Sequence, residues 1–470
     1  MKKNKLLISL VLIILILFSC SDNNDDVDNS AIVLMNLGDS ITNGTQSGKS
    51  NVSEFTQING FAQLLADQIK KIPNIEMTWE NPLLSIDFTT RIRTRKDPSF
   101  LPYNLGVDGQ DIKALLESKS NNPDPIYNYQ KLHTEIVKPI PSILGYEVSQ
   151  LEAAEYVASL HPNKRKIITL FIGNNDVLGA LLAENGTKIT TADITAYLEY
   201  KTDGHDLESI KTNLSTVITR LRNIPHANIF IGTIPHVADA SYLFTEQDIE
   251  SLATFTHEIP DVTVLEKGQA LTLGAMIGFP CSVTTSIFRA LNTNNATLNA
   301  VIQGVVASSD GLSINESETK LFNDRVDTIN NYIKQFADEY KNVTLVDTGS
   351  LLHKASTGEL KVGEHVISRT FGGGLTSVDC FHPSNTTYAI IANEFIQKIN
   401  EAKIIGTIPS IDTASIWEND PYRDKDGDGY VPGPSDIRIV APELWFILDT
   451  DDNDASVLPG YVTGEGLPCQ

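Results

Sequence analysis

Four short runs of consecutive apolar residues recur along this chain, and stretches with helical periodicity lie between and after them. The apolar runs are at 31–38, 166–173, 227–235 and 342–347. Runs of this length are typical of strands that are buried on both faces. The helical patterns lie at 60–72, 148–160, 207–222, 318–340 and 384–399. Strands that alternate with helices predict a mostly parallel sheet covered by helices on both faces.

Two long stretches fall outside this alternation, at residues 82–100 and 240–315. The second contains an apolar segment with several glycines, GQALTLGAMIGFP at 268–280. Such a segment either fills core space or forms a lid or acyl-binding wall, and the core-filling interpretation is the simpler one. In parallel α/β sheets, ligands bind beyond the C-terminal ends of the strands, so we expect functional residues in the loops there.

The N-terminus has the pattern of an export signal. Three lysines within the first five residues precede an apolar stretch at 6–18, which is too short to span a bilayer as a mature helix. The stretch ends in LFSC, which resembles a bacterial lipobox with Cys20 as the lipidated residue. The alternative is a plain signal peptide in which Cys20 is incidental. The sequence therefore predicts a lipoprotein signal peptide at 1–19 and a disordered acidic tether at 20–30.

An exported chain with a lipidated Cys20 would be anchored to the outer membrane, and surface exposure is a further hypothesis. The formal net charge of -23 and the lack of a basic run after the N-terminus exclude a nucleic-acid partner. The other cysteines are Cys281, Cys380 and Cys469. An oxidising compartment permits one disulfide among these three, and its pairing stays open.

Ser40 follows the first apolar run, within NLGDSITNG at 36–44. A Ser on the turn that leaves a buried strand projects its hydroxyl at the edge of the sheet. The N-terminus of a following helix also favours a developing anion. Ser40 is therefore a candidate nucleophile, although a GDS triplet alone recurs by chance.

Two further loops carry candidate oxyanion donors, and a third carries a base. Gly109, in YNLGVDGQD, can bring a backbone N–H close to a substrate oxygen. Asn175, in FIGNNDVL at the end of a strand, offers a side-chain amide. Asp379 precedes His382 by three residues in VDCFHPS. A His that deprotonates a hydroxyl needs a carboxylate to fix its tautomer, and one short turn supplies both groups here.

Taken in this order, the four segments resemble the SGNH (GDSL-type) hydrolase superfamily, and most closely its larger bacterial lipoprotein lipases and esterases. The resemblance covers roughly residues 31–402, within a hydrolase domain expected at 31–405, and implies a flavodoxin-like three-layer α/β/α sandwich. It implies Ser40 as nucleophile, His382 as general base and Asp379 as its orienting partner. The implied oxyanion hole consists of the backbone N–H groups of Ser40 and Gly109 and the Asn175 side chain. The implied catalysis requires no metal or cofactor.

Two residues depart from the family pattern. Asp108 places a charge beside the implied oxyanion hole, and we expect it to point to solvent. Cys380 stands where bacterial members often have Gly, and a structural role is expected because Ser40 already supplies the nucleophile. The remaining histidines have no partner motif and are expected at the surface or as capping groups, with His236 the one candidate substrate contact.

The C-terminal region is rich in Asp, Gly and Pro, which predicts a linker at 406–420 and a small acidic module at 421–470. Asp424, Asp426 and Asp428 alternate before Gly429, as in loops that wrap Ca²⁺. An EF-hand loop would have Glu where Ser435 stands. Together with DDND at 451–454, the segment resembles an acidic DxDGDGY…DDNDxxxxPG metal-binding repeat. We expect a Ca²⁺ site formed by the alternating carboxylates and Asp452; the alternative is a solvated acidic tail.

Two classes of function fit the sequence. The first is a serine ester hydrolase that acts on carboxylic esters through an acyl-enzyme on Ser40, with either lipid acyl esters or O-acetylated glycans as substrate. The second is a non-catalytic surface lipoprotein, such as an adhesin or glycan-binding protein, on the same scaffold. The five intact candidate residues favour the hydrolase.

Overall fold

The structure is a computed structural model of the 470-residue chain. It describes residues 27–46, 53–86, 93–117, 136–137, 148–181, 191–239, 241, 270–271, 313–427, 431–433, 449 and 451–455. The predicted signal peptide, Cys20, Cys281, Asp428, Cys469 and most of the 240–315 stretch lie outside these residues.

A five-stranded sheet with every neighbouring pair parallel lies at the centre of the molecule. Its spatial order is β2-β1-β5-β6-β9. This is the flavodoxin-like order 2-1-3-4-5 counted along the chain. The strands are β1 (Asp28–Gly38), β2 (Glu76–Thr78), β5 (Lys164–Phe171), β6 (Ala227–Gly232) and β9 (Val343–Val346). The predicted α/β fold with a parallel sheet is confirmed.

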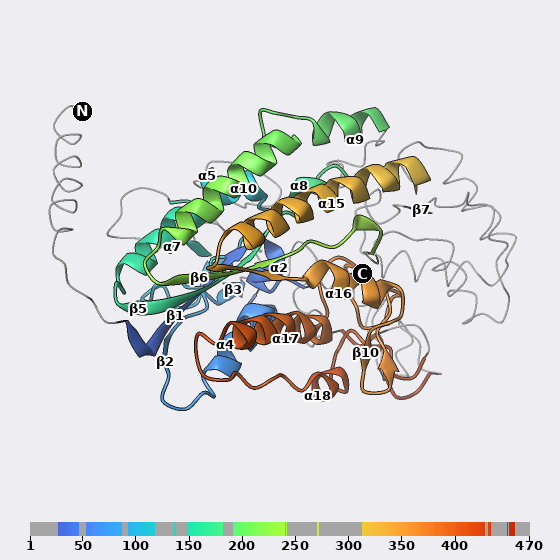
Figure 1. Ribbon diagram of the computed structural model, residues 1–470. Coiled ribbons are helices and arrows are strands. Elements are labelled where there is room, and N and C mark those ends of the chain that lie inside the picture. Colours follow the sequence, from blue (N-terminus) through green and yellow to red (C-terminus); the bar gives the residue numbers. More distant parts are fainter. Residues whose placement is uncertain are drawn as a thin grey trace, which may run out of the picture.

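Both faces of the sheet are covered by helices, which produces the expected three layers (Figure 1). One layer contains α5 (Ile112–Glu117), α7 (Gln150–Ser159), α10 (Leu207–Arg222) and α15 (Glu316–Glu339). The other contains α4 (Phe61–Ile69) and α17 (Asn385–Ala402), which pack on each other. Their rings Phe61 and Phe395 stack with centroids 5.2 Å apart. All five predicted helical patterns form helices.

The apolar runs form central strands because their side chains are buried on both sides. From Ala31 to Leu37 of β1, every residue is buried, including the polar Asn36. Asn36 donates to Thr169 Oγ1 on β5 at 2.8 Å and accepts from Trp79 Nε1 at 2.8 Å. A buried amide thus has partners on both sides of β1, as burial of a polar group requires. β1 begins at Asp28, so the predicted tether at 20–30 ends earlier than its acidic composition indicates.

Short elements complete the described chain. The 82–100 stretch contains an antiparallel hairpin of β3 (Leu84–Ile86) and β4 (Arg93–Arg95). The others are α2 (Ser40–Asn43), α3 (Glu54–Gln57), α8 (Asn175–Leu178), α9 (Thr191–Leu198), the 3₁₀ helix η2 (Val237–Asp239), β7 (Ala270–Leu271), β8 (Ser313–Ile314), α16 (Thr348–Ser356), β10 (Lys361–Val362), β11 (His365–Val366) and α18 (Thr413–Trp417).

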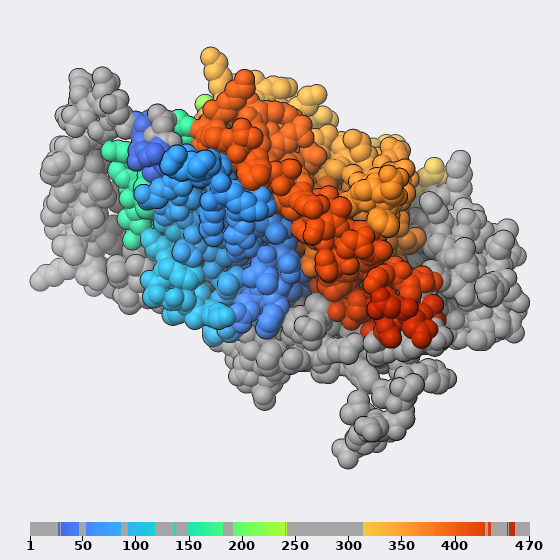
Figure 2. Space-filling view, turned by 90° about the horizontal axis from the view of Figure 1, so that it is seen from below, coloured from blue at the N-terminus to red at the C-terminus, as the bar shows by residue number. Residues whose placement is uncertain are grey.

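Residues after α17 pack closely on the sheet-covering layer. The predicted linker contains α18, and its Ile408, Ile411 and Trp417 are buried. Further on, Tyr422 is 1% exposed and Val431 is fully buried. In the space-filling view, α17 and this C-terminal segment (orange to red) lie beside the N-terminal residues around α4 (blue) (Figure 2). The described part of the acidic region is therefore anchored to the hydrolase fold.

No helix in the described part of the chain has the length and apolar character of a membrane span.

Candidate active site

Ser40 is the first residue of α2, on the sharp turn that leaves β1. Asp39 is the N-cap, and its Oδ1 accepts from the Ile41 N–H at 3.0 Å. Ser40 is partly exposed while Asp39 is fully buried, so the turn presents the serine and hides the carboxylate. Gly38 permits this turn, because a Cβ there would lie 2.1 Å from the Phe171 carbonyl oxygen.

The backbone of Gly38 is held from two sides. Gln150 on α7 accepts from the Gly38 N–H at 3.0 Å and donates to its carbonyl at 2.8 Å. The Val107 N–H donates to the same carbonyl at 3.1 Å. These bonds fix the 104–111 loop beside the Ser40 turn. The sequence pattern did not single out Gln150, since its role depends on a contact 112 residues away.

Asp108 does not point to solvent, contrary to the expectation from sequence. It is 9% exposed, and its Oδ1 accepts from Asn43 Nδ2 at 2.9 Å and from Thr45 Oγ1 at 2.7 Å. Both donors belong to α2 and the turn that follows it. A buried carboxylate needs hydrogen-bond donors, and Asp108 therefore turns inward to the two donors in α2 and the turn after it. Gly109 is exposed directly after it, with φ of 73°.

The GNND segment at 173–176, after β5, contacts both the Ser40 turn and the 104–111 loop. Asn174 Nδ2 donates to Asp39 Oδ2 at 2.8 Å, and Asn175 Nδ2 donates to the Gln110 carbonyl at 2.8 Å. The Asn175 amide therefore lies beside the Gln110–Asp111 peptide, in the same loop as Gly109. The buried Asp176 accepts from the Ile112 N–H at 3.1 Å. The candidate oxyanion donors thus come from three loops that hydrogen bonds hold together.

Asp379 and His382 form a hydrogen-bonded pair just before α17. Their Oδ2 and Nδ1 atoms are 2.6 Å apart. Asp379 Oδ1 accepts three further bonds, from the N–H groups of Phe381 and His382 and from Ser377 Oγ, at 3.0, 2.9 and 3.0 Å. The carboxylate is therefore fixed in place, while the His382 side chain stays 21% exposed.

Cys380 lies inside this turn with φ of 62°. The left-handed region costs a residue with a Cβ about 1–2 kcal/mol, which explains why Gly suits this position. The Cys380 sulfur is fully buried in a disulfide bond whose other cysteine lies outside the described residues. The expected structural role of Cys380 agrees with this bond, and the thiol is not available as a nucleophile.

Contacts between distant segments bring the Asp379–His382 turn to the Ser40 turn. Tyr388 on α17 donates to the Thr45 carbonyl at 2.7 Å. Gln46 Nε2 donates to the Pro383 carbonyl at 3.2 Å and to Asn385 Oδ1 at 2.8 Å. Residues 45–46 and 383–388 are therefore in direct contact, although more than 330 positions separate them in the sequence.

Charge interactions also place His382 beside the serine loop. Desolvation lowers the pKa of His382, but the attraction of Asp379, their hydrogen bond and the charges of Asp108 and Asp39 outweigh it, so its pKa is raised. Burial raises the pKa of Asp379, yet the imidazole and the hydrogen bonds bring the net value below normal. Burial raises the pKa of Asp39 to about 6, against the opposing effects of Asn174, Ile41 and His382.

A serine turn, two loops with the candidate oxyanion donors and an Asp–His pair thus lie at one end of the parallel sheet. Residues 34–395 match the family described as GDSL-like Lipase/Acylhydrolase, which is more than half of the chain and spans all of these loops. The chain belongs to this family. The GDSL-family chain is accordingly a carboxylic ester hydrolase. No curated protein sequence matches it.

Solved structures with a similar fold include three bacterial enzymes. An acetyl xylan esterase from Geobacillus stearothermophilus is 12% identical, with 80% of this chain and 96% of that one covered and a TM-score of 0.33. A phospholipase A1 from Streptomyces albidoflavus is 13% identical, with 79% and 99% covered and a TM-score of 0.34. An extracellular lipase from Streptomyces rimosus is 12% identical, with 80% and 100% covered and a TM-score of 0.34.

Several histidines of this GDSL-family chain have partners that the sequence did not indicate. His205 is 6% exposed and stacks on Tyr197 with ring centroids 4.1 Å apart, so it is a core residue. His161 shares a 2.9 Å hydrogen bond with Tyr103 Oη. His236 pairs with Asp327 at 2.8 Å, and His353 pairs with Asp239 at 2.9 Å.

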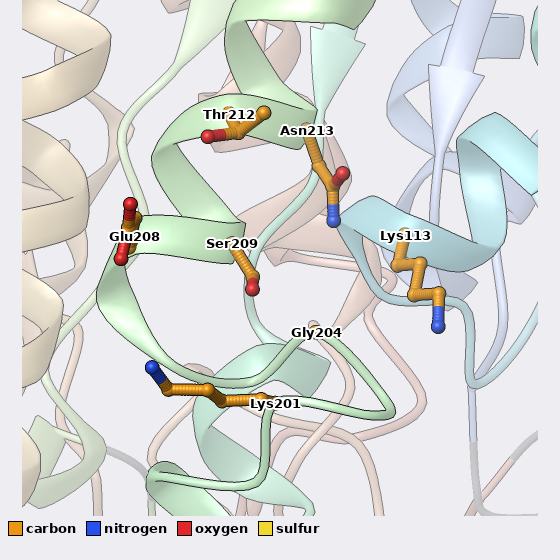
Figure 3. A pocket seen from close by; sticks show the side chains of 7 residues that line it. All are labelled: Lys113, Lys201, Gly204, Glu208, Ser209, Thr212 and Asn213. Atoms are coloured by element: carbon orange, nitrogen blue, oxygen red, sulfur yellow. The ribbon is translucent and has the colours of Figure 1, made fainter.

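A polar pocket of about 280 Å³ opens on the helical layer between α5 and α10 (Figure 3). Its lining carries two lysines, one glutamate and several small polar groups, and it includes none of the candidate catalytic residues: Lys113, Lys201, Gly204, Glu208, Ser209, Thr212 and Asn213. No apolar side chain belongs to this lining, so the pocket does not have the character of an acyl-binding site.

The acidic segment brings three of its predicted ligands together. One carboxylate oxygen each of Asp424, Asp426 and Asp452 lies within 4.8 Å of the others. Burial, together with the charges of the neighbouring carboxylates, raises the pKa of Asp452 to about 6. The Gly427 N–H donates to Asp424 Oδ1 at 2.7 Å, which curls the loop around this group. The fourth predicted ligand, Asp428, lies outside the described residues.

Proposed function

We propose that this ester hydrolase uses Ser40 as its nucleophile, with His382 as general base and Asp379 as the group that orients the imidazole. The single observation that carries the assignment is the 2.6 Å bond between Asp379 Oδ2 and His382 Nδ1, beside the loop that contains Ser40. With Nδ1 held by the carboxylate, Nε2 is the ring nitrogen free to accept a proton.

The reaction then proceeds in two halves. Ser40 Oγ attacks the ester carbonyl while His382 Nε2 takes its proton. The tetrahedral oxyanion accepts from the Ser40 and Gly109 N–H groups and from the Asn175 amide. As the C–O bond breaks, the imidazolium donates its proton to the leaving alcohol, and the acyl group stays on Ser40. Water, deprotonated by His382, then attacks this ester. As the acyl C–O bond breaks, the imidazolium returns the proton to Ser40 Oγ and the carboxylic acid is released.

The N-terminus of α2 supports this assignment. Ser40 begins the helix, so its N–H has no intrahelical carbonyl partner and can donate to an oxyanion. The exposed Gly109 leaves its own peptide accessible on the neighbouring loop. Asn175 uses one N–H to hold the Gln110 carbonyl, and an amide nitrogen has a second N–H for substrate.

A p-nitrophenyl ester series from acetyl to palmitoyl tests the assignment. The Ser40→Ala variant should lose hydrolysis by at least about 10³-fold on every chain length that the wild type accepts. Substitution of the exposed Ser415 on α18 by Ala is the matched control and should retain full activity. An active Ser40→Ala variant would refute the nucleophile. Preference for acetyl over long acyl esters would favour O-acetylated glycans as substrates over lipids.

We also propose that Cys20 carries the lipid anchor that places the enzyme on the outer membrane. The support is the lysine-rich start, the short apolar stretch and the LFSC sequence. Wild-type protein should partition with outer-membrane vesicles, whereas Cys20→Ala should be released or retained as uncleaved precursor. Protease added to intact cells then reports surface exposure. Equal membrane partitioning of mature wild type and variant would contradict the proposal.

We further propose that the acidic module binds Ca²⁺ through Asp424, Asp426 and Asp452. Three clustered carboxylates repel one another, and a hard divalent cation with oxygen ligands relieves that repulsion. Ca²⁺ added to chelator-treated enzyme should raise the Tm by several degrees. Asp452→Asn should abolish this rise, whereas Asn substitution of the exposed Asp412 should preserve it. An identical Ca²⁺ response in the Asp452 variant would exclude the site.

A further inference from the structure

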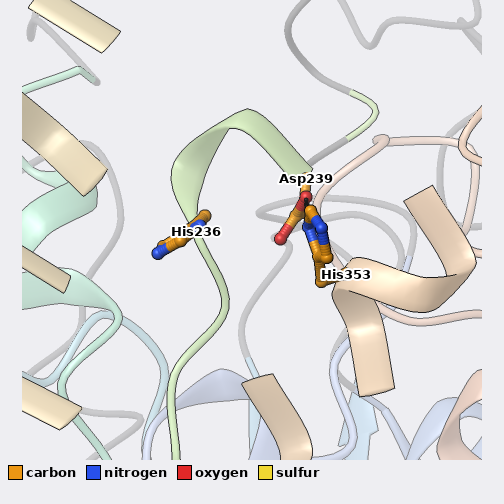
Figure 4. Close-up of side chains that lie close together, drawn as sticks. All are labelled: His236, Asp239 and His353. Atoms are coloured by element: carbon orange, nitrogen blue, oxygen red, sulfur yellow. Dashed lines mark hydrogen bonds and ion pairs between the residues drawn. The ribbon is translucent and has the colours of Figure 1, made fainter. Parts of the chain in front are cut away.

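A second cluster of metal-ligating side chains lies beyond β6 and β9. His236 precedes η2 and Asp239 is its last residue, in the segment that follows β6, and His353 lies on α16, directly after β9. Because β6 and β9 are parallel neighbours, the segments that follow them meet at the same sheet edge. One candidate ligand atom from each side chain lies within 4.8 Å of the others. Figure 4 shows Asp239 against His353, with His236 across the η2 turn.

Only one oxygen of the buried Asp239 carboxylate, at the centre of this cluster, has hydrogen-bond partners. Asp239 Oδ1 shares a 2.9 Å hydrogen bond with His353 Nδ1 and accepts from Ser356 Oγ at 2.6 Å. Asp239 Oδ2 is buried and has no hydrogen-bond partner. The residue as a whole is 6% exposed. Since an unpartnered carboxylate oxygen is costly to bury, this atom indicates a missing cationic or donor partner.

The histidines provide the remaining features of a metal site. His236 Nε2 lies 2.8 Å from Asp327 Oδ1 on α15, so Nδ1 is the ring nitrogen left for another ligand. Metal-bound imidazoles typically use their second nitrogen to hold a carboxylate in this way. The side chains of His236 and His353 are 33% and 57% exposed, which leaves a route for an ion from solvent.

We propose that His236, Asp239 and His353 bind a divalent transition-metal ion, with Zn²⁺ as the best match. Two imidazole nitrogens and one carboxylate oxygen form a ligand set that suits Zn²⁺ and disfavours Ca²⁺ and Mg²⁺, which prefer oxygen ligands. Ligand atoms around tetrahedral Zn²⁺ are about 3.4 Å apart, so a small rotation of the exposed imidazoles closes the site. Three protein ligands leave one position for water.

The site has a structural connection to the loop before the catalytic pair. Arg369 Nη1 donates to the Ala238 carbonyl in η2, and Thr376 Oγ1 donates to Ser241 Oγ at 3.2 Å. Residues 369–376 precede Asp379 directly in the chain. An ion that clamps η2 to α16 would therefore also steady this loop, without sharing a residue with the proposed catalytic machinery.

Zn²⁺ titration of the tag-free mature enzyme by calorimetry, in excess Ca²⁺ to saturate the acidic module, tests the proposal. We expect one Zn²⁺ per chain with a Kd in the micromolar range or tighter, and a Tm increase of roughly 3 °C or more at saturation. His353→Ala should weaken binding at least about 100-fold; its side chain is half-exposed, so the fold is expected to persist. Asp327→Asn should weaken binding by about 10- to 100-fold through His236.

The matched control is His365→Ala, because His365 is another exposed histidine beside a carboxylate, with Nε2 3.6 Å from Glu418 Oε1 and no third metal ligand among the described residues. This variant should bind Zn²⁺ as the wild type does. Bound Co²⁺ should show a visible spectrum that His353→Ala loses. Absence of stoichiometric Zn²⁺ binding, or unchanged binding in the His353 variant, would overturn the proposal and leave a simple His–Asp hydrogen bond.

Discussion

His382 Nδ1 and Asp379 Oδ2 are 2.6 Å apart, while the other oxygen of Asp379 is held by three donors from its own turn. The carboxylate therefore cannot rotate without losing several bonds at once. A fixed acceptor keeps the proton on Nδ1 and leaves Nε2 as the base. One short D-x-x-H turn thus supplies both the imidazole and the carboxylate that orients it, whereas many hydrolases take these two groups from residues far apart in sequence.

Asp379→Asn should lower kcat by about 10³- to 10⁴-fold with little change in KM. The amide can present its N–H to Nδ1, which favours the wrong tautomer and leaves Nε2 protonated. Steady-state kinetics on the best p-nitrophenyl ester measures the effect, with Ser377→Ala as the comparison because it removes only one of the donors to Oδ1. A loss confined to KM would show that Asp379 acts in binding and not in base orientation.

Asp108 should set the acid limb of the pH profile. The pKa of His382 is raised by Asp379 first and then by Asp108 and Asp39, against desolvation. Only neutral imidazole accepts a proton, so activity falls as the pH drops through this raised pKa. Asp108→Asn removes one negative charge and should shift the acid limb of kcat/KM to lower pH.

The control for this shift is Asn substitution of the exposed Asp338 near the end of α15, which should leave the profile unchanged. If the acid limb of Asp108→Asn coincided with that of the wild type, the charge of Asp108 would be irrelevant to His382. Its hydrogen bonds to Asn43 and Thr45 would then be its main role.

The sequence predicts the architecture well because the central strands are long apolar runs. β1, β5, β6 and β9 all fall within or beside the predicted runs, and α10 begins and ends at the predicted residues. The sequence does not predict β2, since the three residues Glu76–Thr78 lie at the sheet edge and only Met77 among them is apolar. An edge strand has one partner and a partly exposed face, so its sequence carries little hydrophobic signal.

The candidate site was predictable only in part. Motifs indicated Ser40 and the Asp379–His382 pair, because each lies within a short local pattern. The inward turn of Asp108 depends on donors in α2 and in the turn after it, 65 and 63 residues away. The pairing of Asp239 with His353 spans 114 positions. Such contacts arise from strand order and loop packing, which a local pattern does not encode.

Asn175→Ala should lower kcat by about 10²- to 10³-fold, as removal of one oxyanion donor typically does. Its amide is held against the Gln110 carbonyl in the Gly109 loop, so the loss should affect the transition state more than substrate binding. Comparison with Asn419→Ala, an exposed amide at the end of α18, separates this effect from a general loss of stability. Equal reductions in kcat for both variants would argue against an oxyanion role.

Asp39→Asn should stabilise the enzyme at pH 8 and leave its stability nearly unchanged at pH 4. Burial raises the pKa of Asp39 to about 6 from 3.8, so the folded state disfavours the ionised form. A carboxyl whose pKa is raised on folding costs stability as the pH rises from about 4 to about 6, and the cost persists above that range. The cost is on the order of 3 kcal/mol, and the neutral amide avoids it.

Asn is also as good an N-cap as Asp. Urea unfolding at both pH values measures the difference; destabilisation at pH 8 would mean that the bonds to Asn174 and Ile41 outweigh the charge.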